Sequence, residues 1–260
     1  MKTLLLCLCL LSSSESIAAA LQPVAPADPA AVKATPASTL RAEAAIAGTT
    51  EKYPLFAMLA EDDPEFGRKW GERLRLALLL APKGSDDKDV ALEAGFNLAL
   101  DRIDPYLLRS SDAATNEFLG LFALLFKEAA ADAGVCAMLL PGEGVKLDKA
   151  EQARIEAALA PRLIEPMILA MTTVVQTGRA GEARTLDESG AQDAMVPLLL
   201  SIGEKHGPDA INTIAHATDR SIEARKRCQA MYWFFDEINA QPEQQRADLI
   251  RTLWAMKGDK

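Results

Sequence analysis

The side chains best suited to chemistry in this chain are two histidines and four cysteines. Histidine is the commonest general base in enzymes, and cysteine acts as a nucleophile, a metal ligand or a disulfide partner. His206 precedes Gly207-Pro208 at an expected helix end, where a cation meets the negative end of the helix. His216 lies among apolar residues within another expected helix. We therefore interpret His206 as a capping residue and His216 as a packed or half-exposed side chain.

Sequence motifs for catalysis and for metal binding are absent. The chain has no G-x-S-x-G nucleophile elbow, no H-E-x-x-H pair, no EF-hand loop, no P-loop and no G-x-G-x-x-G strand–helix unit. Neither histidine follows a glutamate at the three-residue spacing that di-iron helical bundles use. We therefore predict no catalytic residue, no metal site and no cofactor.

One dipeptide resembles part of an enzyme site. Glu188-Ser189 resembles the Glu-Ser step that holds the catalytic acid of lytic transglycosylases, which cleave cell-wall polysaccharide. The Gly-rich segment that follows this step in that family is absent after Gly190. A general acid needs burial to raise its pKa, and Asp187-Glu188 lies in the most polar stretch of the chain. A cell-wall hydrolase is therefore kept only as a second alternative function.

The first 20 residues have the three-part layout of a secretory signal peptide. Lys2 is followed by the apolar run Leu4 to Leu11 and by small residues up to Ala20. The apolar run is too short to cross a bilayer, which takes about 20 residues. We predict cleavage near Ala20 and a periplasmic or secreted location.

Removal of this leader changes which cysteines matter. Cys7 and Cys9 lie in the leader, where lipidation of either is an alternative, although both follow leucine and a small residue is preferred there. Cys136 and Cys228 remain, and Cys228 lies on an apolar helical stripe. Because exported cysteines meet an oxidising compartment, we predict a Cys136–Cys228 disulfide, with two separate buried thiols as the alternative.

The rest of the chain divides into a tether and one domain. Residues 21–49 carry four prolines among many alanines without an apolar period, which is typical of a flexible spacer. Residues 50–260 are predicted to form a single all-helical domain. The best membrane-spanning candidate, Ala157 to Val175, contains Arg162 and Glu165, so we expect no transmembrane segment in the mature chain.

The fold class follows from the patterning. Hydrophobic residues make up 49% of the chain, strand-like alternation is scarce, and helix starts such as Asp63-Pro64 and Ser111 are frequent. The stretch 118–126 is apolar on every side, which places it at the centre of a core. Gly67 and Gly71 lie beside one apolar helix face and suggest close approach of another helix. We predict an all-α, irregular bundle of about eight to ten helices.

Two neighbouring features form a candidate partner surface. Arg225, Lys226 and Arg227, together with Arg220, predict a basic band. Four consecutive aromatic residues, 232–235, cover all sides of one helix because neighbours are about 100° apart. We therefore include Trp233 and Phe234 in the surface, because one of the two is expected to be available to a partner or an apolar ligand. Burial of the whole run by adjacent helices is the alternative.

The overall charge narrows the class of partner. The formal net charge is -9, which disfavours binding to nucleic acid and suits basic partners. Together with the missing catalytic motifs, this predicts an exported, non-catalytic protein-binding protein: an accessory, adaptor or inhibitor of an unidentified envelope or secreted partner. The first alternative is a carrier of a lipid or another small apolar ligand in a helical cavity.

Overall fold

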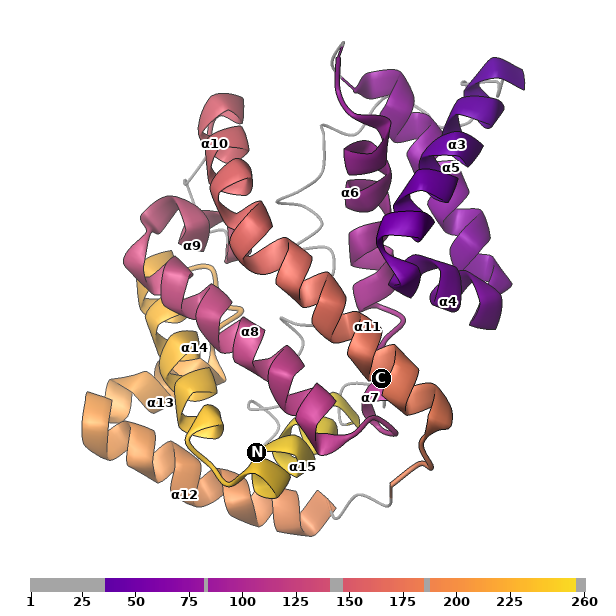
Figure 1. The fold of residues 1–260 in the computed structure, drawn as a ribbon. Coiled ribbons are helices and arrows are strands. Elements are labelled where there is room, and N and C mark those ends of the chain that lie inside the picture. The colour runs from indigo at the N-terminus through magenta and orange to yellow at the C-terminus, as the bar shows by residue number, and fades with distance from the viewer. Residues whose placement is uncertain (1–35, 82–83, 141–146, 185–187, 256–260) are drawn as a thin grey trace. The chain divides into compact units, whose positions relative to one another are not determined.

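The computed structural model describes residues 36–81, 84–140, 147–184 and 188–255. These residues form thirteen α-helices, α3 to α15, one π-helical turn and no strand (Figure 1). The all-α prediction is confirmed, while the expected number of helices was too low. The predicted signal peptide and the first part of the predicted tether lie outside the described residues.

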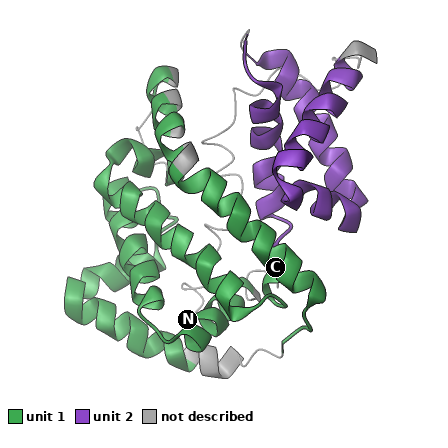
Figure 2. Cartoon of the chain, viewed as in Figure 1, with its two compact units in different colours: residues 1–20, 104–260 green, residues 21–103 purple. Residues whose placement is uncertain are grey.

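Contacts divide the described chain into two compact units, named here in chain order. The first unit, within residues 36–103, is purple and labelled unit 2 in Figure 2, and the second unit, within residues 104–255, is green and labelled unit 1. Each unit has its own buried aromatic residues and its own set of packed helices. The division falls between Ile103 and Asp104, inside the stretch for which we predicted a single domain.

Four helices make up the first unit: α3 (Pro36–Lys52), α4 (Pro54–Asp62), α5 (Pro64–Leu80) and α6 (Asp87–Leu100). Their starts follow the expected capping chemistry. The Asp63 side chain accepts a hydrogen bond from the Glu65 backbone N–H at 3.0 Å, ahead of the proline that begins α5. Asp86 accepts likewise from the Lys88 N–H at 2.8 Å at the start of α6.

The structure corrects the predicted tether over residues 36–49, because these residues belong to α3. Ala42, Ala45 and Thr49 share one face of this helix and are buried. Alanine has the highest helix propensity, and its small side chain allows close packing without the bulky apolar repeat that marks most core helices. The Thr49 hydroxyl donates to the Ala45 and Lys88 carbonyls, at 2.9 and 3.3 Å, which fixes α3 against α6.

An aromatic cluster forms the core of the first unit. Phe56 and Trp70 stack at 4.9 Å between ring centroids, and the Trp70 indole N–H donates to the Ala91 carbonyl at 2.8 Å. The glycine that requires close approach here is Gly95, where an added Cβ would lie 2.7 Å from Trp70 Nε1. Gly67 and Gly71, which we expected in this role, have only ordinary contacts around them.

The second unit contains the remaining elements. They are α7 (Asp104–Leu107), α8 (Asp112–Ala131), α9 (Ala133–Leu139), α10 (Lys149–Leu159), the π-helical turn η2 (Ala160–Ile164), α11 (Glu165–Ala180), α12 (Glu188–His206), α13 (Pro208–Ala215), α14 (Ala224–Asn239) and α15 (Glu243–Ala255).

Helix α8 is the centre of this unit, as its apolar stretch predicts. It contacts α9, α11, α14 and α15, and Ser111 caps its start through the Ala114 N–H. Phe122 packs against Phe118 of the same helix, against Trp254 of α15 and against Phe235 of α14. Large aromatic side chains bury much apolar area each, so this cluster holds α14 and α15 to α8.

A fully buried arginine joins α15 to the start of α8. The Arg251 side chain, 0% exposed, donates to the Leu107 and Ser110 carbonyls at 3.2 and 2.6 Å. It also donates to the Asp112 carboxylate at 2.7 Å and to the Thr115 hydroxyl at 3.2 Å. A buried cation is tolerated only when its donors are satisfied, so these contacts fix the turn between α7 and α8.

We expect Arg251→Met to destabilise the protein by about 3–5 kcal/mol, because it leaves a carboxylate and two carbonyls without their buried donor. Arg184→Met is the matched control, since Arg184 contacts the same Asp112 carboxylate at 2.7 Å but is 40% exposed. Its loss should cost less than about 1 kcal/mol. Urea denaturation followed by circular dichroism measures both, and equal losses would contradict this ranking.

Candidate functional site

The two cysteines that we predicted to pair lie at disulfide distance. Cys136 in α9 and Cys228 in α14 have their sulfurs 2.03 Å apart and their Cα atoms 6.0 Å apart. Both residues are buried. The bond closes a loop with a sequence separation of 92 and ties the helix after α8 to α14.

The residue before Cys228 corrects the predicted basic band. Arg227 is only 2% exposed, so it does not belong to a surface. Its guanidinium donates to the Leu140 carbonyl at 3.1 Å and to the Ala217 carbonyl at 3.3 Å. Burial lowers the pKa of Arg227, and the charge of Arg220 lowers it further, while Asp219 partly offsets both effects. Arg227 therefore ties the end of α9 to the turn that follows α13, beside the disulfide.

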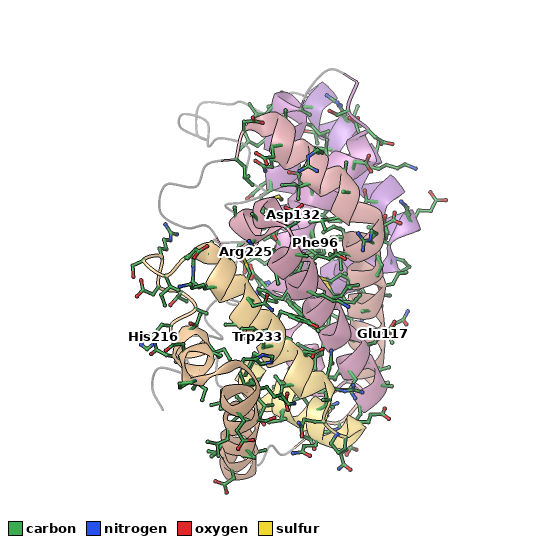
Figure 3. The ribbon with its side chains drawn as sticks, turned by 90° about the vertical axis from the view of Figure 1, so that its left-hand side faces the viewer. Phe96, Glu117, Asp132, His216, Arg225 and Trp233 are labelled. Atoms are coloured by element: carbon green, nitrogen blue, oxygen red, sulfur yellow. A yellow bond between two sulfur atoms is a disulfide. The ribbon has the colours of Figure 1, made fainter. Side chains whose placement is uncertain are left out.

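The other three cations of the predicted band are exposed: Arg220 in the turn before α14, and Arg225 and Lys226 in its first turn. We call these three residues the basic surface. Figure 3 shows Arg225 at the N-terminal end of α14. Two carboxylates lie among them. Asp219 accepts hydrogen bonds from the Ser221 N–H and hydroxyl, which lower its pKa, and Glu223 precedes the helix without a side-chain capping bond.

The aromatic run divides according to helix geometry. Trp233 is half-buried, and its ring stacks on the His206 ring with centroids 4.1 Å apart and planes 4° apart. Phe234, which we had also placed on the partner surface, is 4% exposed and packs at 5.5 Å against Phe235. That prediction is wrong for Phe234, because α14 packs on several sides: α8, α12 and α13 all contact it.

A polar clip beside Trp233 was not predicted. Glu237 in α14 accepts hydrogen bonds from the Ser201 hydroxyl and from the Lys205 ammonium in α12, each at 2.7 Å. Burial raises the pKa of the Glu237 carboxyl, but these hydrogen bonds and the charges of Lys205 and His206 outweigh it, so the pKa lies below its ordinary value. The sequence places Ser201 and Lys205 one helical turn apart, so both were predictable as residues of one helix face. Their shared partner could not be predicted, because Glu237 is 36 residues from Ser201.

The histidines lie apart from any metal-binding arrangement. His206 stacks on Trp233. The expected position of His216 within a helix is wrong: this residue follows the last residue of α13 and is exposed, and its ring Nδ1 lies 2.9 Å from the Asn212 carbonyl. No group of three His, Cys, Asp or Glu side chains placed to hold a metal ion occurs within the described residues. Asp187 lies outside those residues, as do the side chains of Glu188 and Ser189.

No single helix in the described ranges is long and apolar enough to cross a membrane. One pair, Ala150–Leu159 with Arg162–Ala180, passes on length and composition alone and is bent by 46°. Buried core helices have the same composition, and most apolar residues of α11 are buried.

Comparisons of the chain with protein-family models, with curated proteins and with solved structures find no match.

We expect the double substitution Cys136→Ala/Cys228→Ala to lower the free energy of unfolding by about 2–5 kcal/mol, because the loop between the cysteines is long. Urea denaturation measures the loss. Alkylation of the purified chain without reductant, followed by mass measurement, should find neither cysteine modified. Two alkylated thiols would contradict the disulfide.

Glu237 predicts a dependence of stability on pH. Its pKa is lowered in the folded state, so its charged form stabilises the fold at neutral pH, and this contribution is lost as the pH falls below about 5. The free energy of unfolding of the wild type should therefore fall more steeply between pH 6 and pH 3 than that of Glu237→Gln. Parallel curves for the two proteins would show that the clip contributes nothing.

Proposed function

We propose that this chain is an exported, non-catalytic protein-binding protein that contacts an acidic patch of an envelope or secreted partner through its basic surface and Trp233. Its role would be that of an accessory, adaptor or inhibitor protein. The overall negative charge attracts basic molecules, so an acidic patch must be recognised locally, by a surface where cations are concentrated.

The observation that carries this proposal is that two cations lie at the N-terminal end of α14, where the helix dipole is unfavourable for positive charge. Arg225 and Lys226 are exposed in the first turn of α14, which contains no acidic residue. The N-terminal end of a helix is positive, so cations there reduce its stability and anions increase it. Residues that oppose the local preference of a helix, and that form no stabilising contact in exchange, are typical of functional positions. Neither side chain is buried, whereas Arg227 beside them has a structural role.

The neighbouring Trp233 supports the same assignment. It is half-buried on α14, and the His206 ring covers one of its faces at 4.1 Å, so its orientation is fixed before a partner arrives. Tryptophan and arginine are the residue types most enriched among the energetically dominant positions of protein interfaces. A stacked ring on the same helix as exposed cations suits a surface with one apolar anchor and a charged rim.

Export is supported by the layout of the first 20 residues. In an oxidising compartment, two buried cysteines at bonding distance persist as a disulfide, as Cys136 and Cys228 would. In a reducing compartment, the cellular thiols would oppose formation of this disulfide bond.

The test reverses the three charges of the basic surface in the variant Arg220→Glu/Arg225→Glu/Lys226→Glu. A tagged exported chain should recover a partner from an envelope extract, and this variant and Trp233→Ala should each recover at least tenfold less. Thermal denaturation should show no loss of stability in the triple variant, because acids at the start of α14 favour the helix by about 0.3–1 kcal/mol each.

The matched control is Arg73→Glu/Lys127→Glu/Arg154→Glu, which changes the net charge equally at three other exposed cations. It should recover the partner as the wild type does. Recovery of the same partner by all variants, or loss in the control as well, would remove the basic surface from the proposal.

A further inference from the structure

A second unassigned surface lies on α12. Asp193, Val196, Pro197, Leu200 and Glu204 are all exposed and recur at the three- and four-residue spacing of one helix face. We call these five residues the α12 stripe. Val196 is 56% exposed and Leu200 is 58% exposed, and they stand one turn apart. The stripe therefore combines an apolar middle, which gains free energy when another apolar surface covers it, with a carboxylate at each end.

The other faces of α12 are already used by the fold. Met195, Leu198 and Ile202 are buried on its inner face. Ser201 and Lys205 bind Glu237 of α14 on one side. On another side Gly203 approaches α13 so closely that an added Cβ would lie 2.7 Å from Ile211 Cδ1. The stripe therefore belongs to a helix that is held rigidly and presents one free face.

The charges at the two ends of the stripe define its partner. Asp193 and Glu204 are separated by 11 residues, which is about 16 Å along a helix. Pro197 lies inside α12 and lacks an N–H, so the Asp193 carbonyl loses its helical hydrogen bond and adds an acceptor at that end. Both ends thus favour cations, and the middle favours apolar side chains.

We propose that the α12 stripe docks an amphipathic helix of a partner protein that carries a Lys or Arg on each side of an apolar pair. Crossed or aligned packing of two helices buries such pairs against each other. A second copy of this chain is disfavoured, because parallel and antiparallel pairing of two stripes both bring acidic ends together. An anionic lipid surface is disfavoured for the same reason.

The probe is a fluorescent helical peptide with a leucine pair flanked by lysines about three turns apart, compared with the same peptide flanked by glutamates. Anisotropy with the full chain should show about tenfold tighter binding of the lysine peptide, and the difference should shrink as salt is added. Val196→Ser/Leu200→Ser should weaken lysine-peptide binding about tenfold. Asp193→Lys/Glu204→Lys should reverse the preference between the peptides.

The control variant is Leu169→Ser on α11, a leucine that is also 58% exposed but lies outside the stripe. It should bind as the wild type does. Equal binding of both peptides, or unchanged binding by Val196→Ser/Leu200→Ser, would overturn the proposal. So would self-association in sedimentation experiments that the stripe variant abolishes, since the occupant would then be a second copy. None of these readouts involves the basic surface, so the two proposals fail independently.

Discussion

The second unit depends on the burial of one cation. Arg251 has no exposed side-chain area, and its donors end on the Leu107 and Ser110 carbonyls, the Thr115 hydroxyl and the Asp112 carboxylate. Taking a guanidinium out of water is costly unless every donor is satisfied, so α15, the turn before α8 and the first turn of α8 must assemble together. The contacts span up to 144 positions of sequence, which makes this a tertiary constraint on the last helix of the unit.

The far end of α8 is held by different chemistry. There the Cys136–Cys228 bond ties α9 to α14, and Arg227 adds hydrogen bonds to the Leu140 and Ala217 carbonyls beside it. The aromatic cluster around Phe122 fills the space between the two ends. A cation at one end, a covalent bond at the other and apolar burial between them together define how α14 and α15 lie on α8. Each contribution is of a kind that the others cannot replace.

The all-helical class and the helix caps at Asp63 and Ser111 could be predicted, because they depend on local sequence rules. The cysteine pair could also be predicted, because only two cysteines follow the predicted signal peptide. Helix α3 could not, because its packed face is built from alanines that give no bulky apolar period. The candidate surface was predictable only in part. Charge alone placed Arg227 outside, whereas it continues the buried α14 face of Met231, Phe234 and Ile238 at helical spacing. Long-range partners, such as the carbonyls that Arg227 binds, leave no trace in local sequence.

The two proposed surfaces occupy neighbouring helices that are fixed to each other. Glu237 holds Ser201 and Lys205 of α12, and the His206 ring stacks on Trp233, so α12 and α14 are joined at two points. Interaction sites on rigid elements lose less conformational entropy on binding than sites on loops. The α12 stripe presents acids around an apolar pair, and the first turn of α14 presents cations. A partner that engaged both proposed surfaces would need the opposite order of charges at a set spacing, and this requirement would make the helix pair selective.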